Sequence, residues 1–137
     1  MLHGDFSKSY EKADNSQILP TETQKQTLYA LSKKYPIQPA ERWVVLAARD
    51  IMARHAYIEI VDLELERTPW NRFEVSGKQH NHCFQRGSDG IHFVRATGIK
   101  RSGGVNLVAG FRDLAVMKTA QSGFEGYIVD QYTTLPP

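Results

Sequence analysis

The sequence has 137 residues, of which 17 are Lys or Arg and 15 are Asp or Glu, so its formal net charge at pH 7 is +2. This length suits one domain with a sizeable core, and so small a positive excess provides no electrostatic basis for binding nucleic acid or an anionic membrane. No apolar run approaches the length of a membrane span, and the N-terminus lacks the basic-then-apolar order of a signal peptide. We therefore expect no nucleic-acid partner, no membrane partner and no targeting signal in this chain.

The two ends of the chain look cut. The chain begins with Met1-Leu2-His3-Gly4, which leaves scarcely any room for a first strand, and it ends on Pro136-Pro137 just after a patterned segment. We expect residues 1–137 to form a single unit whose first strand is missing.

A helix is predicted to begin just after Pro20. Thr21 precedes Gln24 by three positions, which is the spacing of a capping box, so we expect Thr21 to be the N-cap of a helix from about Glu22 to Lys34. The backbone N–H groups and the dipole at such a helix start favour an anion or a polarised small molecule. The alternative is that the box only caps the helix.

A second helix is predicted after the turn that follows. Pro39 is well placed in the first turn of a helix, and the pattern ends near His55. Residues at helical spacing define the face expected to point inward: Trp43, Leu46, Ala47, Ile51 and the aliphatic stem of Arg54.

From Tyr57 onward the period changes to that of strands. Alternating apolar and acidic residues run to Glu66, and a phase slip at Ile60-Val61 suggests a bulge or twist. We expect a hairpin turn at 75–78, a return strand at 80–86, another turn at 87–90, and strands at 91–97, 106–108 and 114–118. Helices grouped before a strand meander indicate an α+β fold, an antiparallel sheet with two helices packed on one face.

A metal site is the first candidate for chemistry. His80, His82 and Cys83 are ligand types that zinc prefers, but on a strand Cys83 points away from the two histidines, and further ligands would have to come from elsewhere. Cys83, the only cysteine, has no partner for an intramolecular disulfide, which fits a reducing compartment. Asp62, Glu64 and Glu66 are interpreted as a solvated sheet face. We expect no metal.

An aromatic residue between two glycines is the second candidate. Phe124 lies between Gly123 and Gly126, where the backbone can turn sharply and present the ring to a planar ligand, although a core aromatic would fit the same pattern. The segment from Asp130 to Leu135 carries hydroxyl groups that could line a pocket.

Several segments, taken in order, resemble the urate oxidase (uricase) family. They are Tyr10 with 12–16, Leu19-Pro20-Thr21, Lys25, Thr27, Pro69-Trp70-Asn71-Arg72, 77–82, 114–119, 121–127 and 130–136. The resemblance runs nearly end to end and corresponds to the first half of the family's subunit, which has two tandem tunnelling-fold units. It implies a tunnelling fold here, in agreement with the pattern of helices before a strand meander.

The resemblance also implies an activity and roles for particular residues. The family oxidises urate with O2 and water to 5-hydroxyisourate and H2O2 without metal or organic cofactor, as a homotetramer with active sites between subunits. Thr21 would belong to the proton-relay group, the backbone N–H of Glu22 would help to hold the purine, Phe124 would stack on the urate ring, and Leu135 would line the pocket. The compartment would be the cytoplasm in a bacterium or the peroxisome in a eukaryote.

The chain departs from the family pattern at several positions. Glu22 replaces the usual aspartate and Gln26 the usual asparagine, while the family's catalytic lysine, histidine, arginine and glutamine fall outside this chain. We therefore expect the chain alone to be inactive. Two other functions stay open. One is a metal-dependent pterin-type tunnelling-fold enzyme that uses His80 and His82, with Cys83 as a further candidate ligand, and the other is a non-catalytic assembly module that keeps the fold and the subunit interface.

Overall fold

The computed structural model describes residues 1–87, 90–120 and 123–134. Over these residues the chain forms three α-helices, six strands and a 3-10 turn at Lys100–Ser102. In chain order the main elements are β1 (Leu2–Gly4), α1 (Ser7–Lys12), α2 (Thr21–Lys34), α3 (Ala40–Arg54), β2 (Ile58–Arg67), β3 (Trp70–Val75), β4 (Lys78–Arg86), β5 (Ile91–Ile99) and β6 (Gly104–Arg112).

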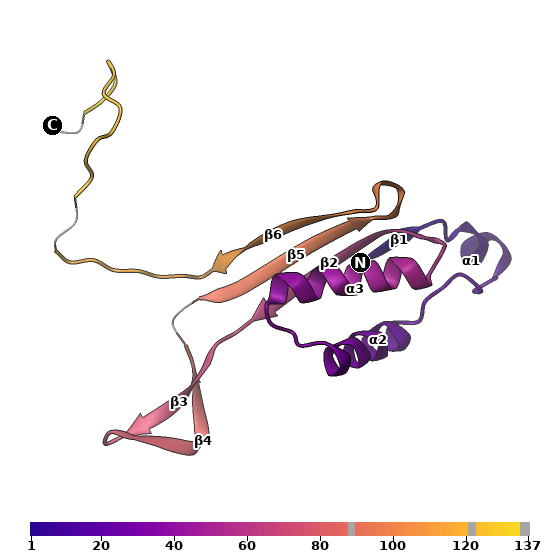
Figure 1. The fold of residues 1–137 in the computed structure, drawn as a ribbon, viewed down its shortest axis with the longest axis horizontal. Coiled ribbons are helices and arrows are strands. Elements are labelled where there is room, and N and C mark those ends of the chain that lie inside the picture. Colours follow the sequence, from indigo (N-terminus) through magenta and orange to yellow (C-terminus); the bar gives the residue numbers. More distant parts are fainter. Residues whose placement is uncertain (88–89, 121–122, 135–137) are drawn as a thin grey trace.

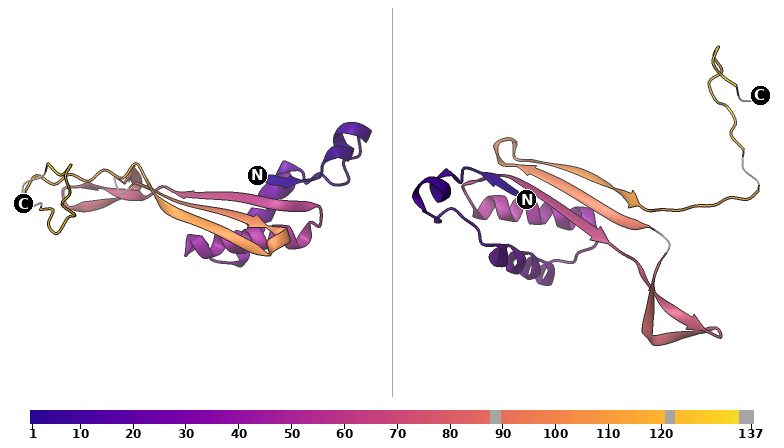
Figure 2. Two further views of the ribbon diagram at one scale, coloured as in Figure 1. Left: turned by 90° about the horizontal axis from the view of Figure 1, so that it is seen from above. Right: turned by 180° about the vertical axis from the view of Figure 1, so that it is seen from behind.

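An antiparallel sheet of order β1-β2-β5-β6 forms the body of the molecule. Helix α3 lies against this sheet with α2 beside it, as Figures 1 and 2 show. Buried residues of both helices share one cluster with the sheet, for Leu31 of α2 and Val44 of α3 pack with Val94 of β5. The expected α+β class, with an antiparallel sheet and two helices on one face, is confirmed.

The buried face of α3 differs in part from the predicted one. Trp43, Ala47 and Ile51 are buried as predicted, but Leu46 is only half-buried and Arg54 is exposed, where it pairs with Asp50. The remaining buried positions are Ala40, Val44, Ala48 and Met52. Small residues at 40, 47 and 48 let the helix approach the sheet closely, so the buried stripe is centred on them and not on the larger side chains.

A short strand occupies the edge that was expected to be empty. Leu2–Gly4 forms β1 and pairs antiparallel with β2, in which His3 lies opposite Ile60 and Gly4 opposite Ile58. The expectation of a missing first strand therefore needs correction, because three residues suffice to form the pairing. The skipped residue, Glu59, is the bulge of β2, one position before the predicted phase slip.

The β3–β4 hairpin and the segment after β6 project from the body (Figure 1). The hairpin has the predicted turn, with Ser76 and Gly77 both at positive φ. No strand forms over 114–118, contrary to prediction. Asp113, at φ 53°, ends β6, and beyond it the chain leaves the sheet, so the backbone of 114–118 has no neighbouring strand within the described ranges.

Candidate functional site

The start of α2 differs from a capping box. Pro20 has an extended backbone and occupies the cap position, so Thr21 is the first helical residue and not the N-cap. The Gln24 amide Nε2 donates to the Leu19 carbonyl at 2.9 Å, whereas in a capping box the Gln24 Oε1 would accept from the backbone N–H of the cap residue. The prediction of Thr21 as N-cap was therefore wrong, because Thr21 already belongs to the helix, which begins one residue earlier than predicted, directly after Pro20.

Backbone donors nevertheless face outward at this helix start. The first backbone bond runs from the Gln24 N–H to the Pro20 carbonyl at 3.0 Å, so the N–H groups of Thr21, Glu22 and Thr23 precede the helical ladder. All three residues are exposed. Together with the helix dipole these amides make the Thr21 end electropositive and accessible to an anion.

The Glu22 carboxylate is engaged along the helix. Its two oxygens accept from Gln26 Nε2 at 2.9 Å and from Lys25 Nζ at 3.1 Å. The hydrogen bond from Gln26, and then that from Lys25, lowers the pKa of Glu22 below its ordinary value. The side chain is therefore ionised at neutral pH and directed toward the second turn of α2.

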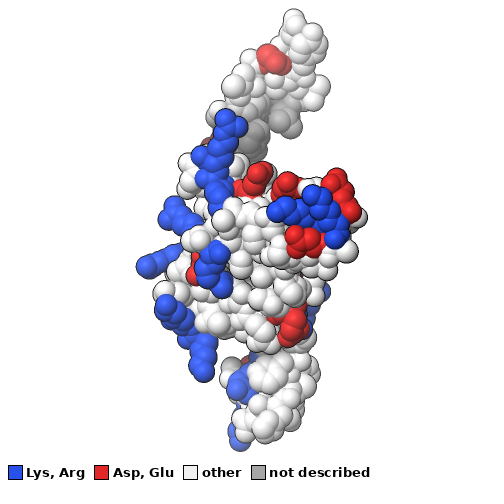
Figure 3. Space-filling model, turned by 90° about the vertical axis from the view of Figure 1, so that its right-hand side faces the viewer, with Lys and Arg blue, Asp and Glu red and all other residues white. Residues whose placement is uncertain are grey.

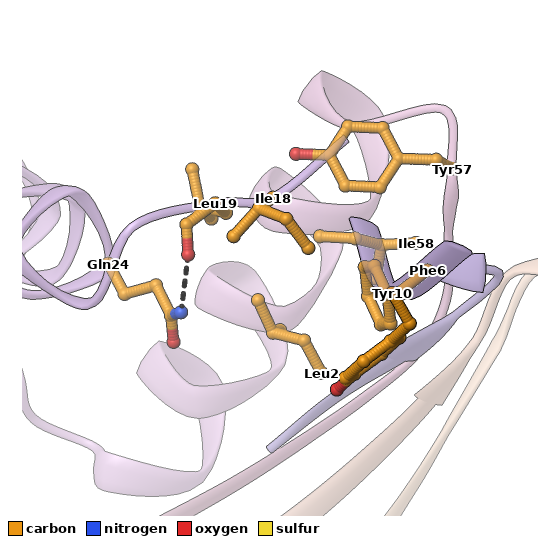
Figure 4. A pocket seen from close by; sticks show the side chains of 8 residues that line it. All are labelled: Leu2, Phe6, Tyr10, Ile18, Leu19, Gln24, Tyr57 and Ile58. Carbon is orange, nitrogen blue, oxygen red and sulfur yellow. Dashed lines mark hydrogen bonds between the residues drawn. The ribbon is translucent and has the colours of Figure 1, made fainter. Parts of the chain in front are cut away.

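A small cavity of about 190 Å³ lies between the N-terminal segment and the body (Figure 4). The Gln24 carboxamide reaches it, and the rest of the wall is Leu2, Phe6, Tyr10, Ile18, Leu19, Tyr57 and Ile58. Thr21 does not line it. This cavity was not predicted from the sequence, in which the apolar side chains among residues 2–19 are its only local signal.

Phe124 lies on the segment after β6. Its side chain is 71% exposed and its ring stacks on Tyr127 with the centroids 5.3 Å apart and the planes at 4°. Figures 1 and 2 place this segment far from α2, so the structure does not bring Phe124 and Thr21 together within one chain. Leu135 lies outside the described residues.

The acidic residues of β2 form ion pairs on the sheet face opposite the helices. Asp62 accepts from Thr97 Oγ1 at 2.6 Å, and this bond and His3 lower the pKa of Asp62. Glu64 pairs with Arg95 at 3.0 Å and also with Arg112, which lowers its pKa. On the side of the molecule shown in Figure 3, several acidic groups likewise lie beside basic ones. These carboxylates are structural partners of neighbouring strands and not a paired acid and base.

The histidines of β4 are exposed, and one hydrogen bond joins His82 to His80. His80 Nδ1 accepts from the His82 backbone N–H at 3.2 Å, and Cys83 is exposed as well. Among the residues that the structure describes, no group of three His, Cys, Asp or Glu side chains could hold a metal ion. In the same ranges, no helix has the length and apolar character to cross a membrane.

Comparison with known proteins points to one family. The uricase family profile matches residues 5–97. The chain is 39% identical to uricase of Oryctolagus cuniculus over 129 residues, which covers 94% of this chain and 43% of the relative. It is 36% identical to uricase of Dictyostelium discoideum, with 98% and 47% covered. The crystal structure of uricase from Arthrobacter globiformis superposes with a TM-score of 0.67 at 26% identity and covers 98% of this chain and 45% of that one.

The chain thus spans less than half the length of these relatives. Its sheet and helices correspond to part of a uricase fold, and the expected tunnelling fold is confirmed.

Proposed function

The chain belongs to the uricase family, and from this membership we propose that it supplies one part of a urate oxidase active site. The reaction is oxidation of urate by O2 and water to 5-hydroxyisourate and H2O2. The observation that carries the proposal is the match over nearly the whole chain, which includes an exposed Thr21-Glu22 pair at the start of a helix and an exposed aromatic at Phe124.

The geometry at α2 suits an anionic purine. Urate that has lost a proton is an electron-rich reductant, so the protein needs chiefly to orient it, stabilise its charge and move protons. The Glu22 backbone N–H would hold the purine edge at the electropositive helix start. The exposed Thr21 hydroxyl would lie at the oxygen side, where it can donate and accept a proton.

The aromatic part of the site would come from a different segment. Phe124 would stack on the purine ring, and Leu135 would line the pocket beside it. Since Thr21 and Phe124 lie far apart in one chain, a complete site needs a second chain, as expected for a homotetramer with its sites between subunits. No cofactor is required by this scheme, and the compartment, cytoplasmic or peroxisomal, stays a prediction.

The test is reconstitution. The chain is mixed with a polypeptide that carries the second half of a uricase subunit, and loss of urate absorbance is followed together with peroxide production. We expect urate consumption and peroxide formation in a one-to-one ratio from the mixture, and no urate consumption by either chain alone. Thr21→Val should abolish turnover, whereas Thr23→Val, an exposed threonine in the same helical turn, should preserve it.

Absence of turnover with every such partner would count against the proposal. Calorimetry of the mixture with a urate analogue then separates two explanations. Binding without turnover would indicate an impaired enzyme, whereas absence of binding would indicate a non-catalytic assembly module.

A further inference from the structure

A carboxylate stands in the first turn of α2, where the proposed purine contact would lie. Negative side chains at this place normally interact with the helix dipole and the free N–H groups. Glu22 is the second residue of α2, and the cap residue, Pro20, provides no side-chain hydrogen bond to the helix start. Its two oxygens are held by Lys25 and Gln26, three and four positions further along.

An unrestrained Glu22 side chain would oppose an anionic ligand in two ways. It would compete for the same N–H donors, and its charge would repel a second anion at short range. The hydrogen bond from Gln26 Nε2 at 2.9 Å draws the carboxylate along the helix surface, away from the helix start. The amides of Thr21, Glu22 and Thr23 thereby stay available.

We propose that Gln26 is a positioning residue for urate, which keeps the Glu22 carboxylate clear of the anion site at the start of α2. The inference rests on the proposed function, since it names what another residue does for that same site. Gln26 itself need not touch the purine. This positioning role also accounts for two departures from the family pattern together, because the longer acid, Glu22, and the longer amide, Gln26, are hydrogen-bonded to each other.

The first experiment uses the chain alone and needs no ligand. The pKa of the Glu22 carboxyl is measured by 13C NMR titration in the unaltered chain, in Gln26→Leu and in Gln131→Leu, an exposed glutamine far from α2. We expect the pKa to rise toward its ordinary value in Gln26→Leu only, because a donor to the charged form is lost. An unchanged pKa in Gln26→Leu would overturn the positioning role.

The second experiment uses the reconstituted mixture and urate. Gln26→Leu should raise KM for urate about threefold or more and leave kcat nearly unchanged, as expected when ground-state and transition-state binding weaken equally. Glu22→Gln combined with Gln26→Leu should restore KM, because a neutral side chain no longer repels the anion. A purely structural role of Gln26 would not be rescued by removing a charge.

The outcomes separate the two claims. A KM that stays raised in the double variant refutes the inference while the proposed function stands. Absence of turnover with the unaltered chain refutes the proposed function, and the urate part of the inference with it, whereas the NMR titration still decides whether Gln26 holds Glu22.

Discussion

Leu31 is the main attachment of α2 to the body of the protein. Its side chain is 7% exposed and packs in one cluster with Trp43, Val44 and Val94, whereas Thr27 is the only other buried residue of this helix. Leu31→Ala removes about three carbons, worth about 2.4 kcal/mol at roughly 0.8 kcal/mol each, and the cavity left behind adds to this. We expect a loss of about 2.5–4 kcal/mol in the free energy of unfolding.

The assay is urea unfolding followed by the fluorescence of buried Trp43 and by circular dichroism. Tyr29→Ala is the matched control, since Tyr29 is on the same helix and 64% exposed, and its cost should stay within about 0.5 kcal/mol. Hydrogen exchange should show that the amides of α2 lose protection first, because α2 has so few buried contacts. Equal costs for the two substitutions would refute the view that Leu31 anchors α2, the helix whose first residue is Thr21.

Three further predictions concern charge, association and activity. The pKa of Asp62 is lowered by the Thr97 hydrogen bond, so the ionised Asp62 stabilises the fold above its unfolded pKa of about 3.9, and this stabilisation is lost as pH falls through the folded pKa. Thr97→Val should therefore reduce the loss of stability at acidic pH in unfolding titrations. The same loss in both proteins would contradict the role of this hydrogen bond. β6 is an edge strand on which Val108 is 60% exposed, so the chain should associate in light scattering and Val108→Lys should reduce the association; a monodisperse unaltered chain would count against this. Phe124→Ala should leave the stability of the chain within about 0.5 kcal/mol but abolish turnover in the reconstituted mixture, and normal turnover would remove Phe124 from the site.

Much of the fold could be predicted because its signals are local. The span of α2 followed from apolar spacing and agreed with the structure to within a residue, and the turn at Ser76-Gly77 followed from its composition. The prediction failed where a neighbour decides the outcome. The segment 114–118 is mostly apolar, but a strand needs a partner, and the chain leaves the sheet after Asp113.

The candidate site shows the same division. Sequence patterns indicated Thr21 as a helix end and Phe124 as a presented aromatic, and the family resemblance supplied their roles. Neither could reveal that Pro20 takes the cap position, because this depends on backbone dihedrals at one residue. The pairing of Glu22 with Gln26 was equally hidden, since spacing permits such a bond without requiring it.

The sequence by itself therefore determined the family and the fold class, because periodicity, turn composition and motif order are properties of neighbouring residues, while its candidate site residues stay predictions. Only the tertiary structure decided how the buried stripe of α3 differs from the predicted one, that Leu2–Gly4 pairs with β2, and that Thr21 and Phe124 are far apart in one chain. The physical reason is that burial, ion pairing and strand partnership join residues remote in the chain. The distance between Thr21 and Phe124 is what makes a second chain necessary for the proposed site.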